Sequence, residues 1–293
     1  MQESIDALAK EFPAVDYRPL KLDLSSQKAV RAAAAELLSW PDVPAIDVLV
    51  NSAGVMNIPE RTITEDGIEI HFATNHIGHF LFTSLIMPKL LKAASGNPPG
   101  TTRIVNVTSN SPTVSQMRWS DMNFNKISKD LPKEEQPPYA MLKRFGVLDP
   151  EEKSYIPIEG YNQSKVANML FSVAANKRLA EKHGILSLAV HPGVIRTELS
   201  RYAAPETVAA IGEMLKSGAF YIKTLGAGAA TSLVAATDPR LRIPASKDGK
   251  ENYGVYFADC QISEKGAPGA ISSEEAEKLW KLSEELVKEK FAW

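Results

Sequence analysis

The chain has 293 residues, 44% of them hydrophobic and 23% charged, which is an ordinary composition for a soluble globular protein. A net charge of −2 gives no basic surface that would indicate nucleic acid or an anionic membrane as a partner. A single cysteine, Cys260, excludes an intrachain disulfide framework, and no stretch reaches the roughly 18 apolar residues of a membrane span. We therefore expect a cytoplasmic protein without a secretory signal or a membrane span.

Helical spacing of apolar residues alternates with short β-branched runs through the first third of the chain. In chain order the sequence predicts a helix at 1–12, a strand at 17–24, a helix at 27–40, a strand at 46–50, a helix at about 66–94 and a strand at 103–108. An irregular, charged and Pro-rich stretch follows at about 110–159. It is too long for an ordinary connection, so we expect it to be functional.

The same alternation continues to the end of the chain. The sequence predicts a helix from Gly160 to about 182, a strand at 185–190, helices at 203–217 and 228–237, a strand at 253–257 and a closing helix at 273–290. Ser272 and Glu275 form a capping box at the start of the last helix. Alternating strands and helices indicate an α/β fold with a doubly wound, mostly parallel sheet, and we expect one domain over residues 1–293.

Tyr161 and Lys165 are four residues apart, so on a helix they share one face. An ammonium close to a phenol lowers the pKa of that phenol, and a tyrosine tuned in this way can exchange a proton with an alcohol or carbonyl near neutral pH. In a chain with eight tyrosines this spacing also arises by chance, so the pair alone is weak evidence.

Three further groups follow predicted strands, at the end of the sheet where doubly wound proteins bind ligands. The segment 51–54 (Asn-Ser-Ala-Gly) follows one strand, Ser109 ends the next, and Pro192-Gly193 follows a third. Each group alone has an ordinary explanation in turn chemistry or a surface serine. Their occurrence after successive strands, with Tyr161 and Lys165 between the last two, is hard to assign to chance.

With these motifs the sequence resembles the short-chain dehydrogenase/reductase family over nearly its whole length. The matching pieces are Asn51-Ser52-Ala53-Gly54, Asn75, Ser109, Tyr161-Asn162-Gln163-Ser164-Lys165 and Pro192-Gly193-Val194-Ile195-Arg196-Thr197. The segments IVNVTS (104–109) and TNHIGHF (74–80) are similar to sequences of the family branch that contains retinol dehydrogenases and WW-domain oxidoreductases. The resemblance implies a Rossmann-like fold and hydride transfer between a nicotinamide cofactor and an alcohol, ketone or aldehyde.

The resemblance also implies catalytic roles for four residues. Tyr161 would be the general acid/base on the substrate oxygen, and Lys165 would hold the phenolate and bind the nicotinamide ribose. Ser109 would donate a hydrogen bond to the substrate oxygen. Asn75 would position a water that links Lys165 to solvent. No metal is implied.

The implied cofactor is NADP, with NAD as the alternative. Asp23 would bind the adenine, and Thr197 the carboxamide or pyrophosphate. Asn51 and Gly54 would let the backbone approach the ribose. The other implied cofactor-binding residues are Ala53, Tyr161, Lys165, Pro192, Gly193 and Val194. The expected partner is an apolar small molecule, retinoid-, steroid- or polyketide-like, and a homodimer is an open option.

One part of the family pattern is missing from this sequence. The chain contains no glycine-rich phosphate-binding turn and begins at what looks like the helix after the family's second strand, so we expect a fold whose first two strands are absent. Our hypothesis is an incomplete gene model or a shortened product. Either the strand at 17–23 shifts inward to pair with the strand at 46–50, or residues 48–50 form an open edge. The segment 226–228 (Gly-Ala-Gly) is interpreted as a helix start rather than a substitute turn.

Two other functions remain open. The chain could be a catalytically silent binding or regulatory protein, or a gene product unable to hold the cofactor. A methyltransferase-like nucleotide binder explains the sheet but not Tyr161 with Lys165. His71, His76 and His79 share one predicted helix but lack further ligands, so we interpret them as packing residues. The aromatic residues of the irregular stretch either line a pocket or anchor it; these are Trp119, Tyr139, Phe145 and Tyr155.

Overall fold

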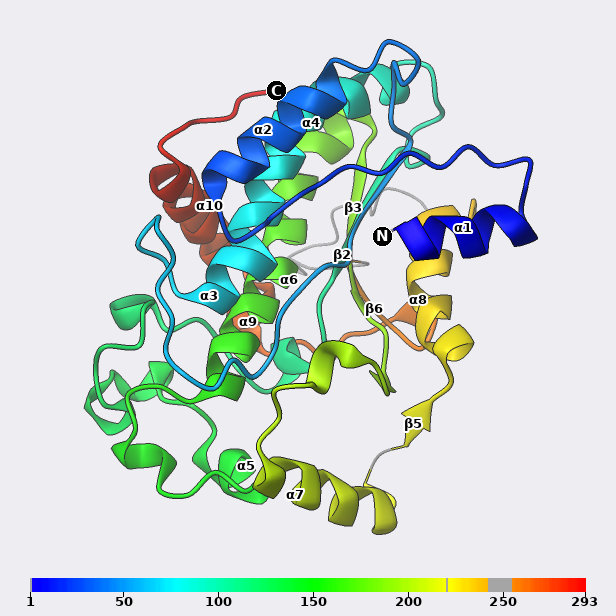
Figure 1. Ribbon diagram of the computed structural model, residues 1–293. Helices are drawn as coiled ribbons and strands as arrows, with labels where there is room; N and C mark the ends of the chain where they lie inside the picture. The colour runs from blue at the N-terminus through cyan, green and yellow to red at the C-terminus, as the bar shows by residue number, and fades with distance from the viewer. Residues whose placement is uncertain (1, 220, 242–254) are drawn as a thin grey trace.

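The computed structural model describes residues 2–219, 221–241 and 255–293, and its centre is a five-stranded sheet (Figure 1). The strand order is β1-β2-β3-β6-β7, with the first four strands parallel and β7 antiparallel to β6. The strands are β1 (Val48–Asn51), β2 (Arg103–Val107), β3 (Leu186–His191), β6 (Tyr256–Ala258) and β7 (Gln261–Ile262). The mostly parallel sheet predicted from the alternation of elements is confirmed.

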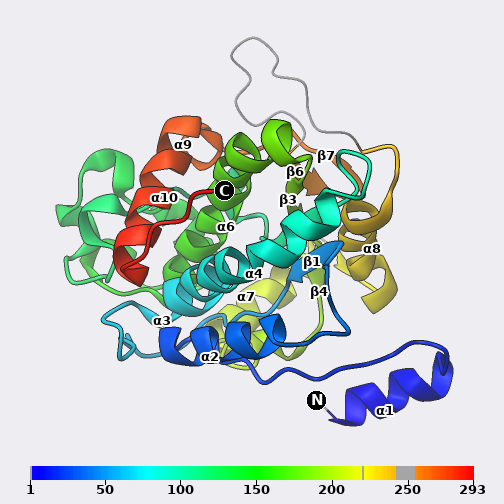
Figure 2. The same cartoon turned by 90° about the horizontal axis from the view of Figure 1, so that it is seen from above.

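Helices cover both faces of this sheet (Figure 2). On one face lie α2 (Gln27–Leu38), α4 (Gly78–Ala94), α6 (Pro157–His183) and α10 (Ser273–Val287). On the other face α8 (Leu225–Thr237) packs against β2 and β3. Strand residues point alternately to the two sides, so Ile104 contributes to the large core under α4 and α6, while Val105 contributes to a small core under α8. The Rossmann-like α/β fold is therefore confirmed.

Serine side chains and a glycine cap the ends of three of the helices. The Ser26 side chain accepts a hydrogen bond from the backbone of Ala29 at the start of α2. The Ser272 side chain accepts from the backbones of Glu274 and Glu275, so α10 begins where the capping box predicted. Gly184 caps the end of α6, and a residue with a side chain rarely adopts its φ of 69°.

The smaller elements surround this framework. They are α1 (Gln2–Glu11), α3 (Ile70–Phe72), the π-helical η1 (Ala73–Ile77), α5 (Tyr139–Arg144), α7 (Pro205–Lys216), α9 (Pro268–Ile271) and the parallel pair β4 (Val194–Ile195) and β5 (Ile222–Lys223). The helix predicted from residue 66 begins at Ile70, because Glu69 caps it by accepting from two backbone amides. Residues 253 and 254 of the last predicted strand lie outside the described residues. No helix in the described part of the chain is both long and apolar enough to cross a membrane.

The strand predicted at 17–24 is wrong. This segment contains no strand, and within the described residues β1 pairs only with β2, so of the two alternatives the inward shift does not occur and residues 48–50 form the edge of the sheet. An extended segment without a neighbouring strand has no ladder to join. The Asp23 side chain instead accepts from the backbone and hydroxyl of Ser25. β1 is left as an edge strand, and on its α8 side Val48 and Val50 are 36% and 43% exposed.

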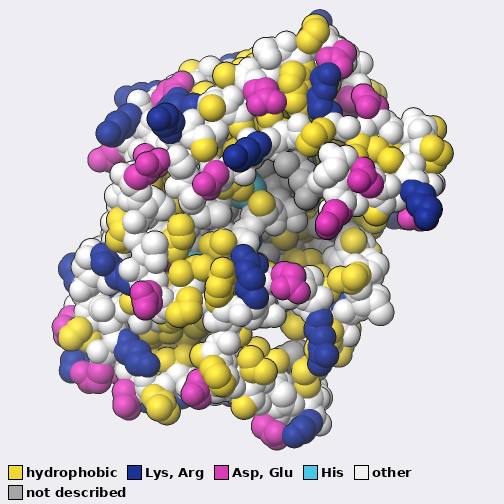
Figure 3. Space-filling view, viewed as in Figure 1, with side chains coloured by type: hydrophobic (Ala, Val, Ile, Leu, Met, Phe, Trp, Pro, Cys, Tyr) yellow, Lys and Arg dark blue, Asp and Glu magenta, His cyan; other side chains and the backbone are white. Residues whose placement is uncertain are grey.

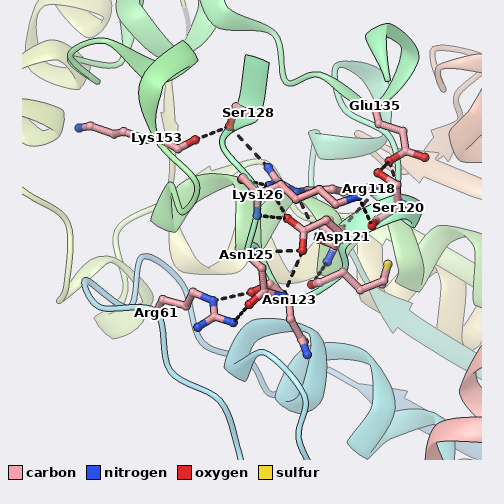
Figure 4. A network of polar contacts seen from close by, with 12 residues as sticks. Arg61, Arg118, Ser120, Asp121, Asn123, Asn125, Lys126, Ser128, Glu135 and Lys153 are labelled. Atoms are coloured by element: carbon pink, nitrogen blue, oxygen red, sulfur yellow. Dashed lines mark hydrogen bonds and ion pairs between the residues drawn. The ribbon is translucent and has the colours of Figure 1, made fainter. Parts of the chain in front are cut away.

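The irregular stretch after β2 is held by a buried polar network (Figure 4). Arg118 donates to the Asp121 carboxylate at 2.6 Å and to the carbonyl of Lys126 at 2.5 Å. The other Asp121 oxygen accepts from the backbone of Asn125. Arg61 reaches in from the segment after β1 to the carbonyl of Asn123. Because these contacts join distant parts of the chain, the stretch has a fixed shape despite having little regular structure.

Candidate active site

A cavity of about 580 Å³ lies at the carboxyl ends of the parallel strands. Ser109, Tyr161 and Lys165 all line it, although they come from the end of β2 and from α6. Figure 3, drawn from the same side as Figure 1, shows this face of the molecule hollowed, with hydrophobic side chains exposed around the hollows in its lower half. The structure therefore brings these three side chains together on one wall.

Tyr161 and Lys165 occupy one buried face of α6, one turn apart. The Lys165 ammonium donates to the carbonyl of Val107 at 2.9 Å and lies 5.6 Å from the centre of the Tyr161 ring. Burial lowers the pKa of Lys165 to about 8. Burial also raises the pKa of Tyr161 to about 12, opposed only by a hydrogen bond with the side chain of Ser109. The expectation that Lys165 lowers the pKa of Tyr161 is thus wrong for this arrangement, because burial dominates.

Ser109 is held by hydrogen bonds to its side chain and to its backbone carbonyl. Its Oγ lies 2.6 Å from Ser111 Oγ and accepts from the Ser111 backbone amide at 2.9 Å. Its carbonyl accepts from the Tyr256 hydroxyl at 2.9 Å, which ties the end of β2 to β6. The hydroxyl is therefore presented to the cavity from a rigid turn rather than from a free loop.

Asn75 lies behind the cavity wall, in the π-helical turn η1. Its side chain accepts from the amide of Val55 at 2.8 Å and donates to the Val55 carbonyl and to Ser164 Oγ, each at 2.9 Å. A Cβ on Gly54 would lie 2.9 Å from Asn75 Oδ1, so only glycine fits this approach without movement. Asn75 thus clamps the turn after β1, and none of its hydrogen bonds reaches Lys165.

The predicted cofactor-binding residues fall into two groups. Gly54, Pro192, Gly193 and Thr197 line the cavity beside Tyr161 and Lys165. Others support the wall without lining it. Buried Asn51 donates to Thr83 and Asn106, the Ala53 carbonyl contacts His79, and Val194 starts β4.

Asp23 is the exception among the predicted residues. It is exposed, it does not line the cavity, and its carboxylate bonds Ser25 in a turn that leads into α2. Hydrogen bonds from the Ser25 side chain and backbone lower the pKa of Asp23. The structure therefore does not bring Asp23 together with the rest of the predicted site.

Several cavity residues were not identified from the sequence. Ser52 and His191 line the cavity; Ser52 lies within the 51–54 motif but was given no role, and His191 directly precedes Pro192, which is the signal that could have flagged both. Leu225, Gly228 and Ser232 come from α8, whose sequence carries no sign of this contact. Gly228 packs so closely on Ile195 that a Cβ would lie 2.1 Å from its side chain. Gly228 therefore allows α8 to pack tightly on Ile195 and also lines the cavity.

The three histidines near α4 have separate partners. His71 lies 2.6 Å from Glu69, His76 lies 2.8 Å from Ser283, and His79 donates to the Ala53 carbonyl at 2.9 Å. In the described residues no three His, Cys, Asp or Glu side chains are grouped to hold a metal. The aromatic residues of the irregular stretch do not line the cavity; Trp119 bonds Glu275 and Tyr155 bonds the Ile58 carbonyl, so both act as anchors.

Sequence comparison connects this chain to known enzymes. The profile of the short chain dehydrogenases matches residues 1–121. Short-chain dehydrogenase TIC 32 A, a chloroplastic protein of Brassica napus, is 34% identical over 97% of this chain and 77% of its own. Retinol dehydrogenase 14 of Mus musculus is 35% identical over 91% of this chain and 66% of its own. The chain therefore spans about two thirds to three quarters of the length of these relatives.

Solved structures agree on the fold. A crystal structure of an uncharacterized protein from Mycobacterium Paratuberculosis superposes with a TM-score of 0.57 at 26% identity, covering 93% of this chain and 76% of the other. The Pseudomonas aeruginosa RhlG/NADP complex gives 0.52 at 18% identity over 81% and 77% of the two chains, which supports the fold alone. This chain is an enzyme of the short-chain dehydrogenase/reductase family and resembles its retinol dehydrogenases.

Proposed function

We propose that this protein interconverts an alcohol and a ketone or aldehyde by hydride exchange with a nicotinamide cofactor. The observation that carries the proposal is the placement of Ser109, Tyr161 and Lys165 on the wall of one cavity. A hydroxyl donor, a phenol and an amine are the groups that a carbonyl oxygen needs as it gains charge and then a proton.

The proton chemistry favours the reduction direction as the starting point. With a pKa of about 12, Tyr161 is protonated at neutral pH and is ready to give its proton to a carbonyl oxygen. Ser109 donates to the same oxygen and stabilises its developing charge. Lys165, with a pKa of about 8, is mostly protonated at pH 7 and stabilises the phenolate that Tyr161 leaves behind. In the oxidation direction each of these proton movements reverses.

The cofactor would be NADP, with NAD as the alternative. When bound it supplies or receives the hydride. Gly54 and Gly193 both line the cavity, and a Cβ on either would meet a neighbouring side chain, Asn75 at 2.9 Å or Lys223 at 2.6 Å, so a ring and ribose bound there would meet backbone. The relative TIC 32 A is named a short-chain dehydrogenase, and the RhlG structure contains NADP.

The substrate would be apolar. The apolar side chains that line the cavity include Val50, Ile195, Leu199 and Leu225. Apolar walls with a few convergent polar groups are typical of sites for small hydrophobic molecules. Retinol dehydrogenase 14 is among the relatives, so retinoid-like aldehydes belong among the first compounds to test.

The test is NADPH oxidation with a panel of aliphatic, aromatic and retinoid aldehydes, comparing the wild type with Tyr161→Phe. We expect Tyr161→Phe to lower the turnover rate roughly 100-fold or more, because the general acid is lost. Tyr221→Phe is the matched control, since that phenol is 67% exposed and does not line the cavity. Equal turnover by Tyr161→Phe and the wild type would contradict the proposal.

A second function, a catalytically silent binding protein, is favoured by one observation: Asp23, the residue expected to bind the adenine, does not line the cavity. Calorimetric titration with NADPH and NADP separates the two. Cofactor binding without hydride transfer to any aldehyde of the panel would support the silent protein. Binding with transfer that depends on Tyr161 would exclude it.

A further inference from the structure

A chain of hydrogen bonds leads from Ser109 away from the cavity to the carboxylate of Glu159. Ser109 Oγ lies 2.6 Å from Ser111 Oγ, which in turn donates to Asn162 Oδ1 at 2.8 Å. Asn162 Nδ2 then donates to Glu159 Oε1 at 2.7 Å. Tyr161 joins the other end through its hydrogen bond with Ser109. The chain thus connects the phenol to a carboxylate through three side chains.

The direction of every bond in this chain is set by its last member. An ionised carboxylate can only accept, so Asn162 must turn its amide nitrogen to Glu159 and its amide oxygen to Ser111. An amide oxygen also only accepts, so the single hydroxyl proton of Ser111 is committed to Asn162. In the contact between the two serines, Ser109 is then the donor.

These bonds leave one hydrogen-bonding position of the Ser109 hydroxyl oxygen open. Its proton points to Ser111, and the Ser111 backbone amide already donates to its oxygen. While Glu159 is ionised, Ser109 can therefore meet the Tyr161 hydroxyl only as an acceptor. When Glu159 is neutral, Asn162 and Ser111 can turn and Ser109 can donate to the phenol, which is the direction in which this hydrogen bond lowers the pKa of Tyr161.

Local structure explains why Glu159 holds this position. α6 begins with Pro157, and Glu159 lies in its first turn, where backbone amides favour a carboxylate. The carboxylate lines a second cavity of about 220 Å³, which also contains Arg118 and Glu135. Burial raises the pKa of Glu159 to about 7, while Asn162 and Arg118 oppose this rise. The charge at the end of the chain can therefore change between pH 6 and 8.

We propose that Glu159 and Asn162 are positioning residues that fix the donor direction of Ser109, so that Tyr161 donates to Ser109 while Glu159 is ionised. The proposal deepens the proposed function, because it concerns the residue assigned there as the general acid. When a carbonyl oxygen occupies the cavity, the Ser109 proton turns from Ser111 to that oxygen. Protonation of Glu159 removes the constraint on Asn162 and lets the chain reverse.

The first test needs no cofactor or activity. Protein labelled with carbon-13 at the tyrosine Cζ is followed by NMR from pH 5 to 9, and the Tyr161 signal is assigned by its loss in Tyr161→Phe. We expect this signal to shift with a midpoint near the pKa of Glu159. The shift should be absent in Glu159→Gln, and also in Ser111→Ala, which breaks the chain but leaves Glu159 in place.

Other charged groups define the control. Lys165, His191, Glu198 and Arg201 line the cavity of Tyr161, and Glu135 shares the second cavity with Glu159. Glu135→Gln removes the same charge from that cavity but lies outside the chain, so the shift should remain. A shift that survives both Glu159→Gln and Ser111→Ala would come from groups such as Lys165 and would overturn the proposal. So would the absence of any shift in the wild type.

The second test measures aldehyde reduction with NADPH. We expect Glu159→Gln to lower kcat roughly fivefold to tenfold with KM changed less than about twofold, because bound substrate is still held but Ser109 is misdirected. Glu135→Gln should match the wild type. An unchanged kcat in Glu159→Gln would overturn the proposal while Tyr161→Phe still tests the proposed function. If Tyr161→Phe retains activity, the proposed function fails. The NMR result alone then tests the chain of hydrogen bonds.

Discussion

The ammonium of Lys165 lies 5.6 Å from the centre of the Tyr161 ring, with both side chains buried on one face of α6. The ammonium donates to the carbonyl of Val107 and not to the phenol. Lys165 thus lies beside the phenol proposed as the general acid, and its ammonium is hydrogen-bonded to the end of β2. The pair gives the site an amine that can stabilise a phenolate without forming one in advance.

The first prediction removes this amine. We expect Lys165→Met to lower hydride transfer by roughly 100-fold or more, since the phenolate left after proton donation loses its positive neighbour. Folding should be little affected, because methionine has a similar length and Val107 still accepts from Asn168 at 3.2 Å. Initial rates and thermal melting measure the two effects. Lys177→Met, on the exposed side of α6, is the control, and an equal loss there would contradict the prediction.

That Ser109, Tyr161 and Lys165 lie together could be predicted from the sequence, because the relevant spacing is either local or imposed by topology. Tyr161 and Lys165 share a face through their separation of four residues. Ser109 joins them because parallel strands end at one edge of the sheet. The Glu159–Asn162–Ser111 chain could not be read in the same way, since it depends on side-chain directions across two segments.

The largest errors of the sequence interpretation concern elements whose neighbours decide their structure. Residues 17–24 have the composition of a strand but no strand beside them, and so Asp23 ends in a surface turn. The contribution of α8 to the cavity wall was not predicted, because the α8 residues that line the cavity are of types that do not by themselves indicate a binding site. The pKa of Tyr161 was expected to fall, but burial outweighs the charge of Lys165, and burial cannot be measured from spacing.

A second prediction concerns the network that shapes the irregular stretch (Figure 4). The side chains of Arg118 and Asp121 are only 7% and 3% exposed. Removing one partner leaves a buried charge, so we expect Arg118→Met to lower the free energy of unfolding by about 3–5 kcal/mol. Lys129→Met breaks only the exposed ion pair with Glu152, so its loss of stability should be far smaller. Urea unfolding of both variants measures the difference, and similar losses would contradict the prediction.

A third prediction follows from two buried histidines. Burial lowers the pKa of His79 to about 4 and that of His76 to about 3. In the unfolded chain both titrate near 6.5, so below that pH the unfolded state binds more protons and the free energy of unfolding falls as pH falls. Each histidine contributes up to about 1.4 kcal/mol per pH unit.

Urea unfolding at pH 7.5 and 5.5 measures this dependence. We expect the wild type to lose stability at the lower pH, and His79→Gln to lose less, because glutamine can still donate to the Ala53 carbonyl but does not titrate. The comparison between the two proteins isolates His79 from other titrating groups. An identical difference between the two pH values in both proteins would show that His79 is not the cause.

The last prediction concerns the open edge of the sheet at β1. Val48 and Val50 are exposed there beside backbone groups that no strand pairs within the described residues, a combination that promotes association with another chain. We expect sedimentation velocity to show concentration-dependent association that Val48→Lys reduces, because a charged side chain on an edge disfavours strand pairing. The free energy of unfolding should change by less than about 0.5 kcal/mol, since Val48 has little to lose by substitution at the surface. Val114→Lys replaces a valine that is 40% exposed outside any strand, so it should leave association unchanged. If both substitutions reduce association equally, added charge rather than the β1 edge is responsible.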